Sequence, residues 1–309
     1  MKKIFIDGKA GTTGLRIEER LGMRDDVTII SLPEHLRKDP DAKKQVLNSV
    51  DIAFLCLPDD AAREAVSMID NENVVVIDTS TAHRTNPAWA YGFPELDSEL
   101  EEKIRTSKRI AVPGCHASGF IALVYPLVKN GIIARDTLLT AHSLTGYSGG
   151  GKKMIAEYEG EDRSILLDAP RQYALGQKHK HLPEMTKITG LESNPIFCPI
   201  VSDFYSGMEV TVPLFKSQLL KGDIETIKEI YKQTYNSTLV YYKENSHEDG
   251  FLSCGKMSGK DSMEIEVFGN EERIILTARY DNLGKGASGA AVECLNIVLG
   301  AEKTKTLVL

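Results

Sequence analysis

The first third of the chain alternates short apolar runs with amphipathic segments. The apolar runs have the length and composition of buried strands: Lys3–Ile6, Val27–Leu32, Asp51–Leu57 and Val74–Ile77. Between them lie segments with the residue spacing of amphipathic helices: Leu15–Leu21, Asp41–Asn48 and Asp59–Ile69. Near-continuous apolar strands separated by helices are typical of a parallel sheet that is covered on both faces. The pattern therefore predicts an α/β fold that begins with a doubly wound, parallel-sheet dinucleotide-binding domain.

From about residue 130 onward, strand patterns outnumber helical ones. Strands are predicted at Leu138–Tyr147, Ile196–Ser202, Glu209–Phe215, Met263–Phe268 and Arg273–Tyr280, with Gly269 and Asn270 in a hairpin turn. Helices are predicted at Lys152–Glu159, Ile224–Tyr235 and Ala290–Leu299. This is the pattern of a second, α+β domain, and the small residues of the last helix allow it to pack closely against the first domain. We expect a first domain of residues 1–115 and 285–309, and a second of residues 116–284.

A glycine-rich turn follows the first predicted strand. Its glycines are Gly8, Gly11 and Gly14, with Thr12 and Thr13 between the last two, and a helical pattern begins directly afterwards. Strand, glycine turn and helix form the context of a dinucleotide-binding loop, in which the pyrophosphate lies on the helix N-terminus. The spacing is GxxGxxG rather than GxGxxG, so a glycine-rich turn without a ligand remains the alternative interpretation.

The end of the second predicted strand indicates which nicotinamide cofactor is bound. An NAD site usually places an acidic residue there, to bind the ribose diol, whereas an NADP site carries small polar and basic groups. Ser31 occupies that position, with Arg37 and Lys38 close behind it. The sequence therefore predicts NADP, although a solvated loop would account equally for the two basic residues.

Cys115 lies where a predicted strand, Arg109–Val112, gives way through Pro113-Gly114 to an apolar segment with helical spacing. At a helix start, unpaired N–H groups and the positive end of the helix dipole lower the pKa of a thiol, and the thiolate is the nucleophile. The same N–H groups could stabilise an oxyanion. A small cysteine packed in the core is the alternative. The carboxyl ends of parallel strands share one edge of a sheet, so we expect Cys115 and the glycine turn at the same edge.

Two further clusters of polar residues lie in the predicted second domain. Tyr147–Lys152 is a glycine-rich loop before a helix, suited to a phosphate or carboxylate, or simply a flexible turn. His179 and His181 would point to the same face of an extended segment, close to Glu184. They could bind a metal, although no third ligand is apparent, or lie unused on the surface. We favour an acid/base role for His179 in thiol chemistry, with His181 holding the substrate and with His83 and His116 as further candidates.

Composition narrows the function further. The chain has 309 residues, 42% apolar and 26% charged, and a net charge of −7, which argues against nucleic acid or an anionic membrane as a partner. Five scattered cysteines without metal-ligand spacing are typical of reduced thiols, so we expect a cytoplasmic protein. The N-terminal apolar run is too short for a signal peptide, and no run is long enough to span a bilayer.

Several of these motifs together resemble the N-acetyl-γ-glutamyl-phosphate reductase family of arginine biosynthesis, in its shorter form. The match runs along the whole chain, through Gly8–Gly14, Asp78–Arg84, Tyr91–Leu96, Pro113–Ser118, Ser148–Lys152, His179–Glu184 and Asp281–Gly300. The resemblance implies a two-domain fold like that of aspartate-semialdehyde dehydrogenase and glyceraldehyde-3-phosphate dehydrogenase. It also implies NADP as cofactor, Cys115 as nucleophile, and a homodimer or homotetramer formed through the second domain.

The function expected from this resemblance is NADPH-dependent reduction of N-acetyl-L-glutamyl 5-phosphate to N-acetyl-L-glutamate 5-semialdehyde and phosphate, through a thioester on Cys115. Catalysis is expected from Cys115, His179 and His181. The residues expected to bind the cofactor are Gly8, Gly11, Thr12, Thr13, Gly14, Ser31, Arg37, Pro58, Ser80, Asn282 and Gly284. Those expected to bind the acyl-phosphate substrate are Arg84, Ser118, Ser148, Gly149, Lys152 and Glu184. No metal is expected.

Two alternatives remain open on the sequence. Aspartate-semialdehyde dehydrogenase, or a related acyl-phosphate reductase, would perform the same chemistry on a different substrate. A non-catalytic protein that senses dinucleotides could have kept the fold, but it would tolerate the loss of Cys115 and of the histidine pair, and both are present.

Overall fold

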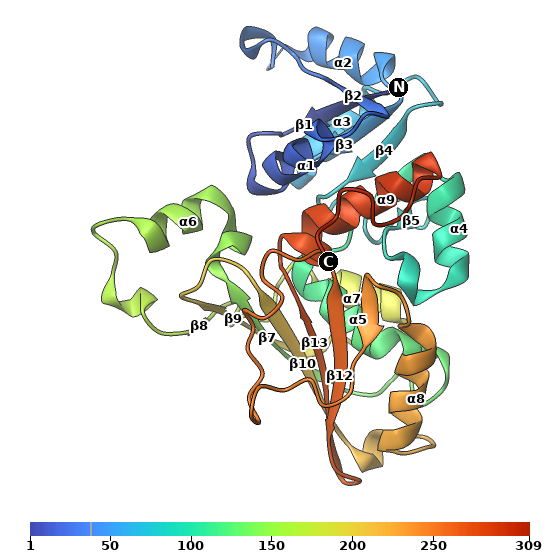
Figure 1. Ribbon diagram of the computed structural model, residues 1–309, viewed down its shortest axis with the longest axis vertical. Coiled ribbons are helices and arrows are strands. Elements are labelled where there is room, and N and C mark those ends of the chain that lie inside the picture. The colour runs from blue at the N-terminus through green and yellow to red at the C-terminus, as the bar shows by residue number, and fades with distance from the viewer. Residues whose placement is uncertain (38) are drawn as a thin grey trace. The chain divides into compact units, whose positions relative to one another are not determined.

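The structure is a computed structural model that describes residues 1–37 and 39–309 (Figure 1). It divides into two compact units. Unit 1 comprises residues 1–94, 98–113 and 287–307, and unit 2 comprises residues 95–97, 114–286 and 308–309. The chain therefore crosses from unit 1 to unit 2 immediately before Gly114, so Cys115 is the second residue of the long stretch that belongs to unit 2.

Unit 1 is built on a six-stranded parallel sheet. Its strands are β1 (Lys2–Asp7), β2 (Val27–Ile30), β3 (Ile52–Leu55), β4 (Val75–Asp78), β5 (Ala90–Tyr91) and β6 (Arg109–Ala111). Its helices are α1 (Thr12–Gly22), α2 (Pro40–Ser49), α3 (Asp59–Ser67), α4 (Ser98–Thr106) and α9 (Gly289–Leu299). The strand order is β2-β1-β3-β4-β6-β5, so the order reverses between β1 and β3. Ligands of doubly wound sheets bind beyond the carboxyl ends of the strands at such a reversal, where Gly8 and Pro58 lie here.

Apolar residues cover both faces of this sheet, as the near-continuous apolar strands predict. On one face, residues such as Ile4 and Phe54 pack with α1 and α9, and on the other Phe5 and Leu55 pack with α2 and α3. Successive residues of a strand point to opposite faces, so a strand buried on both sides must be apolar throughout. The predicted doubly wound domain is confirmed.

Unit 2 is built on a seven-stranded mixed sheet with the order β11-β12-β13-β10-β7-β9-β8. The strands are β7 (Thr140–Gly146), β8 (Arg171–Gln172), β9 (Ile196–Ser202), β10 (Met208–Phe215), β11 (Val240–Tyr242), β12 (Met263–Gly269) and β13 (Arg273–Tyr280). Its helices are α5 (Cys115–Lys129), α6 (Gly151–Glu159), α7 (Leu182–Thr189) and α8 (Ile224–Thr234). Helices α5 and α8 pack on one face of the sheet, and α7 packs against α5 (Figure 1). The predicted α+β architecture and the β12–β13 hairpin are confirmed.

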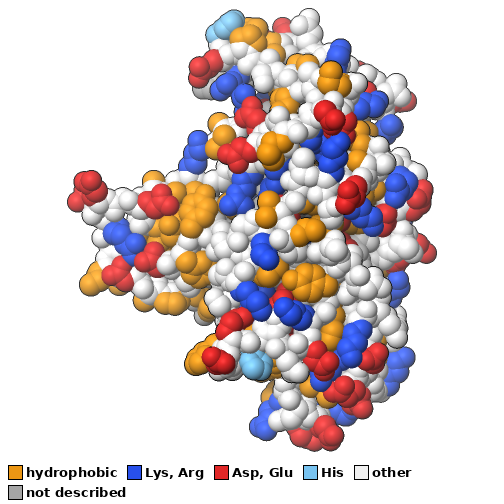
Figure 2. Space-filling view, viewed as in Figure 1, with side chains coloured by type: hydrophobic (Ala, Val, Ile, Leu, Met, Phe, Trp, Pro, Cys, Tyr) orange, Lys and Arg blue, Asp and Glu red, His pale blue; other side chains and the backbone are white. Residues whose placement is uncertain are grey.

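The opposite face of this sheet carries a mixture of apolar and charged side chains. Ile196, Phe215 and Ile275 are exposed on it, whereas Arg279 and Glu266 are buried there as an ion pair with a 2.7 Å separation. Apolar side chains also gather on the lobe that carries α6 (Figure 2). Within residues 1–37 and 39–309, no helix is both long and apolar enough to cross a membrane.

Helix α5 carries a proline in its last turn, and a tyrosine of unit 2 compensates for it. Pro126 has no N–H, so the carbonyl of Ala122, four residues earlier, loses its helical donor. The hydroxyl of Tyr235 donates to that carbonyl at 2.6 Å, and the hydroxyl of Tyr231 donates to the carbonyl of Leu123. Both tyrosines are fully buried, and Tyr235, the residue after α8, supplies the hydrogen bond to Ala122 that the helix cannot make itself.

Tyr235→Phe should destabilise the protein by about 1–3 kcal/mol, because the Ala122 carbonyl is then buried without a donor. Chemical denaturation measures the free energy of unfolding. Tyr242→Phe is the matched control, since the Tyr242 hydroxyl is buried without a hydrogen-bond partner in the described part of the chain. Its removal should be neutral or slightly stabilising. Equal stability losses in the two variants would contradict this account of Pro126.

Candidate active site

The glycine turn after β1 has a backbone path that side chains cannot follow. Gly8 has a φ of +81°, and a Cβ there would lie 2.2 Å from the carbonyl oxygen of Cys56. A Cβ on Gly14 would lie 2.6 Å from the carbonyl oxygen of Gly8. These two glycines therefore allow the turn to fold tightly against the sheet and α1 to start close behind it.

The N-terminus of α1 is suited to an anion. Gly11 is the N-cap, no side chain caps the helix, and no acidic residue lies in its first turn. The first N–H groups of a helix have no intrahelical acceptors, and the helix dipole favours negative charge beside them. Gly11, Thr12 and Thr13 therefore present the setting in which a dinucleotide pyrophosphate binds.

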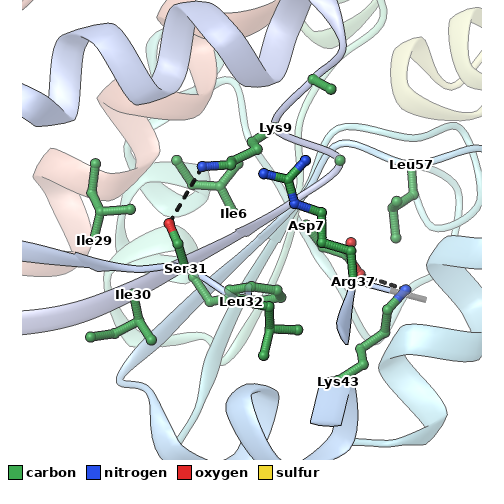
Figure 3. A pocket seen from close by; sticks show the side chains of 13 residues that line it. Ile6, Asp7, Lys9, Ile29, Ile30, Ser31, Leu32, Arg37, Lys43 and Leu57 are labelled. Atoms are coloured by element: carbon green, nitrogen blue, oxygen red, sulfur yellow. Dashed lines mark hydrogen bonds and ion pairs between the residues drawn. The ribbon is translucent and has the colours of Figure 1, made fainter. Parts of the chain in front are cut away.

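A pocket of about 270 Å³ opens between the ends of β1 and β2 (Figure 3). Ser31, Lys9, Arg37 and Lys43 lie among the residues that line it. Lys9 Nζ lies 3.5 Å from Ser31 Oγ and 3.1 Å from Glu18, and Lys43 is paired with Asp7 at 3.1 Å. Figure 3 shows Lys9, Arg37 and Lys43 among the side chains that line the pocket, with Lys9 directed toward Ser31. Three cations and a serine fit a ribose that carries a phosphate, and Ser31 offers no carboxylate that would repel it. Lys38 lies outside the described residues.

The remaining residues of interest in unit 1 have mainly local contacts. Pro58 is the N-cap residue of α3, directly after β3. The Ser80 hydroxyl donates to Asp78 at 2.7 Å, and the Asp78 carboxylate also lies 2.6 Å from His83 Nδ1. The guanidinium of Arg84 is buried and donates to the carbonyls of Val112 and Thr79, each at 2.8 Å. The segment from Asp78 to Arg84 is therefore a tightly hydrogen-bonded loop.

In unit 2, Cys115 is the first residue of α5, as the sequence predicts. Gly114 is the N-cap and no side chain caps the helix, so the N–H groups of His116 and Ala117 have no intrahelical acceptor. The Glu184 carboxylate accepts from the Gly114 N–H at 2.8 Å. The buried Tyr280 hydroxyl accepts from the Gly119 N–H at 3.0 Å and donates to the Cys115 carbonyl. Side chains from α7 and β13 thus hold this end of the helix.

Three imidazole rings gather beside the start of α5. The ring centroids of His116 and His179 are 5.6 Å apart, those of His116 and His181 are 5.7 Å apart, and those of His179 and His181 are 4.7 Å apart. His181 is the N-cap of α7 and has a helical rather than an extended backbone conformation, yet its ring still lies against that of His179. Within the described ranges, no three His, Cys, Asp or Glu side chains are arranged to hold a metal ion.

The hydrogen bonds of His179 define which of its ring nitrogens carries the proton. The backbone N–H of His181 donates to His179 Nδ1 at 3.1 Å, so Nδ1 carries the lone pair and Nε2 the hydrogen. Burial, and then the charge of Lys180, lower the pKa of His179 to about 4. Burial, and then His179, lower the pKa of His116 to about 3. Both imidazoles are therefore neutral at pH 7.

The other predicted residues of unit 2 support the same region by local contacts. Asn282 is buried, accepts from the Gly207 N–H and donates to Ser148 Oγ, both at 3.0 Å. Gly149 lies next to this amide, since a Cβ there would be 3.2 Å from Asn282 Nδ2. Gly284 packs against the backbone carbonyl of Lys260. The Ser118 hydroxyl donates to the Gly114 carbonyl within α5. Lys152 is exposed on α6.

Sequence reasoning missed several side chains at these sites. Tyr173, whose hydroxyl lies 2.7 Å from His116 Nε2, follows the two-residue strand β8, and no periodicity or motif marks it. Lys9 and Lys43 reach the pocket of unit 1 from a turn and from α2, and as single charged residues they resemble any solvated lysine. Among the basic residues that line this pocket, only Arg37 could be recognised from the sequence, because it follows closely after β2.

A dinucleotide-type sheet in one unit, and a helix-start cysteine with neighbouring imidazoles in the other, define the class of semialdehyde dehydrogenases. Residues 8–104 match the family described as "Semialdehyde dehydrogenase, NAD binding domain", and residues 115–282 match "Semialdehyde dehydrogenase, dimerisation domain". Curated relatives are more specific. The chain is 44% identical to N-acetyl-γ-glutamyl-phosphate reductase 2 of Nostoc sp., over 96% of this chain and 97% of the relative. It is 43% identical to the reductase 2 of Pseudomonas putida, with the same coverage.

The chain therefore belongs to the N-acetyl-γ-glutamyl-phosphate reductase family, and the resemblance inferred from its motifs is confirmed. The expectation of an oxidoreductase that uses a nicotinamide dinucleotide is confirmed with it.

Solved structures show the same fold at low sequence identity. Aspartate semialdehyde dehydrogenase II of Vibrio cholerae, complexed with ASA, superimposes with a TM-score of 0.72 at 18% identity, covering 97% of this chain and 98% of that one. Aspartate semialdehyde dehydrogenase of Candida albicans, solved with NADP, gives a TM-score of 0.68 at 16% identity, covering 97% and 99%. The predicted fold class is confirmed, and the expected NADP agrees with the cofactor of the latter.

NADPH should be preferred over NADH by at least about tenfold in kcat/KM, because the end of β2 carries Ser31 instead of an acidic residue and three cations line the pocket beside it. Lys43→Ala should lower kcat/KM for NADPH by about tenfold and leave that for NADH nearly unchanged. Lys44→Ala is the control. Lys44 lies on α2 like Lys43, but it pairs with Asp70 and is not among the residues that line the pocket. Steady-state kinetics with both cofactors measure this, and equal efficiency with NADH and NADPH in the wild type would contradict the assignment.

Proposed function

We propose that this protein reduces N-acetyl-L-glutamyl 5-phosphate with NADPH to N-acetyl-L-glutamate 5-semialdehyde and phosphate, the third step of arginine biosynthesis. The observation that carries the proposal is Cys115 at the uncapped start of α5, beside three imidazoles. Unit 1 is the NADP-binding unit in this proposal, and unit 2 carries the covalent chemistry. Near-full-length similarity to curated reductases supports the choice of substrate.

In the first half-reaction the Cys115 thiolate attacks the acyl carbon of the substrate. The negative charge moves to the carbonyl oxygen, and N–H groups of the first turn of α5 are placed to stabilise it. The C–O bond to phosphate then breaks, the electron pair leaves with the phosphate, and a thioester remains on Cys115. Covalent attachment replaces a bimolecular reduction by one in which the acyl group is already held in place.

The second half-reaction releases the aldehyde from Cys115. When bound, NADPH supplies the hydride that reduces the thioester. Hydride addition leaves an oxyanion, which takes a proton from a neighbouring group to give the hemithioacetal on Cys115. That proton returns to the same group as the C–S bond breaks, the aldehyde forms and the sulfur leaves as a thiolate. An imidazole next to Cys115 can move that proton, since a neutral histidine accepts one readily near pH 7.

We assign the proton transfer to His181 rather than to His179. His179 has its only lone pair on Nδ1, which already accepts from the His181 backbone N–H. To act as a base it would have to give up this hydrogen bond, and burial already disfavours its charged form. His179 is instead a hydrogen-bond donor through Nε2, which suits it to holding an anionic oxygen of the substrate.

Among the remaining predicted residues, Glu184 has the clearest structural role. Its carboxylate accepts a hydrogen bond from the Gly114 N–H at the start of α5, where the helix dipole stabilises a negative charge. We propose that it holds Cys115 in place as well as contacting substrate. Asn282 and Ser148 form one hydrogen-bonded pair, which we propose to orient the nicotinamide and the acyl group respectively.

We propose a homo-oligomer assembled through unit 2, as a homodimer or a homotetramer. The dimerisation domain of the family covers this unit. The sheet face opposite α5 carries exposed apolar residues, Ile196, Phe215 and Ile275, which a second copy of the chain could cover. All five cysteines are free, which supports a cytoplasmic location for the working enzyme.

The pure protein should oxidise N-acetylglutamate semialdehyde with NADP in a reaction that requires inorganic phosphate. Aspartate semialdehyde should be a substrate poorer by at least about a hundredfold in kcat/KM, roughly 2.7 kcal/mol of discrimination. Absorbance of NADPH follows both reactions. A preference for aspartate semialdehyde would show that the chain shares the chemistry but not the substrate of its curated relatives.

Cys115→Ser should fold and bind NADP but lose almost all reductase activity, because a serine hydroxyl is not ionised at neutral pH. Iodoacetamide should label Cys115 ahead of the other four cysteines, and burial raises the pKa values of Cys56 and Cys254 to about 12. Peptide mass spectrometry identifies the labelled thiol. Turnover near that of the wild type in the serine variant would eliminate the covalent mechanism.

His181→Asn should lower kcat by about a hundredfold or more, as expected when an acid/base group is lost. His179→Asn should mainly raise KM for the acyl phosphate, because it removes a donor and leaves the proton-transfer group in place. Steady-state kinetics of the two variants separate these effects. The opposite pattern would return the acid/base role to His179, the assignment that the sequence alone favoured.

A further inference from the structure

Tyr173 places a phenol hydroxyl among the histidines beside Cys115. Its ring lies 6.1 Å from that of His116 and 6.0 Å from that of His179, measured between centroids. The rest of the ring packs against a small apolar cluster that includes Tyr158 and Leu167, and the Tyr173 backbone N–H donates to the Pro199 carbonyl. The side chain is therefore held at its base, and the hydroxyl is the end that faces the imidazoles.

The hydroxyl is the last member of a chain of three side chains. Ser143 Oγ, on β7, lies 2.6 Å from His116 Nδ1, and His116 Nε2 lies 2.7 Å from the Tyr173 hydroxyl oxygen. Ser143 is fully buried, and His116 is buried and neutral. A neutral imidazole has one donor nitrogen and one acceptor nitrogen, so the chain can run in only two directions.

In the first direction, His116 Nδ1 donates to Ser143, and Tyr173 donates to Nε2. The hydrogen of the Ser143 hydroxyl then has no acceptor, because His116 is its sole hydrogen-bond partner in the described part of the chain. A buried donor without an acceptor is costly. In the second direction, Ser143 donates to Nδ1 and Nε2–H donates to the Tyr173 oxygen. Every buried hydrogen is then used, and the phenol hydrogen is left over at a half-buried position.

We propose that Tyr173 is a further catalytic residue, whose hydroxyl donates to an anionic oxygen of the acyl-phosphate substrate bound at Cys115. Ser143 and His116 are its positioning residues, because their hydrogen bonds direct the phenol hydrogen away from the protein and toward the ligand. This inference rests on the proposed function. It adds a third neutral donor to the site, beside the N–H groups of α5 and His179 Nε2–H.

Two observations agree with this role. Burial, and then the nearby Cys115, raise the pKa of Tyr173, so the phenol remains protonated and available as a donor throughout the working pH range. A phenol that accepts from an imidazole N–H is also a better donor, because hydrogen bonds in a chain polarise one another.

Tyr173→Phe removes the hydroxyl and keeps the packing of the ring. It should lower kcat/KM for N-acetylglutamyl phosphate, or for the semialdehyde in the reverse reaction, by about tenfold to a hundredfold, as for a hydrogen bond to a charged group. Tyr241→Phe, on β11, is the control and should stay within about twofold of the wild type. A wild-type protein without reductase activity would refute the proposed function. An active wild type with an equally active Tyr173→Phe would refute only this inference.

Ser143→Ala tests the positioning chain through a double-mutant cycle. Without Ser143, His116 Nδ1 loses its hydrogen-bond partner, so the imidazole is held less firmly and its Nε2–H orients the phenol less well. The single variant should therefore lose about three- to tenfold in kcat/KM, whereas the same change in the Tyr173→Phe background should have no further effect. Losses that multiply in the double variant would show that Ser143 acts on stability or packing, not through Tyr173.

The ring nitrogens of His116 provide a test that does not depend on activity. Nitrogen NMR of protein labelled with ¹⁵N-histidine distinguishes a protonated from an unprotonated ring nitrogen, and the His116 signals are those absent from His116→Gln. We expect hydrogen on Nε2 and a lone pair on Nδ1 in the wild type. Hydrogen on Nδ1 in the wild type would overturn the proposal.

Discussion

The position of the α5 N-terminus is the constraint on which the rest of unit 2 depends. Cys115 can act as a nucleophile only if the first turn of this helix is open to a ligand and held still. No side chain caps it, yet it is anchored from two sides. The Tyr280 hydroxyl bridges Gly119 N–H and the Cys115 carbonyl, and Glu184 accepts from Gly114. Gly119 makes this possible, because a Cβ there would lie 2.7 Å from the Tyr280 hydroxyl.

The electrostatics of the site follow from burial. His116 and His179 are kept neutral because the charged imidazolium would lose its hydration, so they contribute directed N–H groups and lone pairs rather than positive charge. In the proposed reaction, the thiolate, the oxyanion and the phosphate would then meet preorganised dipoles. Such dipoles need little reorganisation when charge develops, which is the general advantage of this kind of stabilisation.

Unit 1 uses a different physical solution for an anionic ligand. It has an uncapped helix N-terminus at α1 and, separately, a pocket lined by cationic side chains that are paired with carboxylates, as Lys9 is with Glu18 and Lys43 with Asp7. If a phosphate bound here, it would replace a carboxylate as the partner of a lysine. Each lysine would therefore have an anionic partner both with and without the ligand.

The sequence by itself determined the features that depend on neighbours along the chain. Strand and helix periodicity identified the two sheets, the glycines identified the tight turn between β1 and α1, and Pro113-Gly114-Cys115 identified the cysteine at a helix start. Short elements such as β8 and α7 were not predicted, because two-residue strands have no period and the HxH segment was taken as extended. Only the tertiary structure brought Ser143, His116 and Tyr173 into one chain, and only it placed the His181 N–H on His179 Nδ1. Pairings across 27 and 57 residues leave no local signal, since the sheet register and the packing of α5, rather than any spacing along the chain, decide which polar atoms meet.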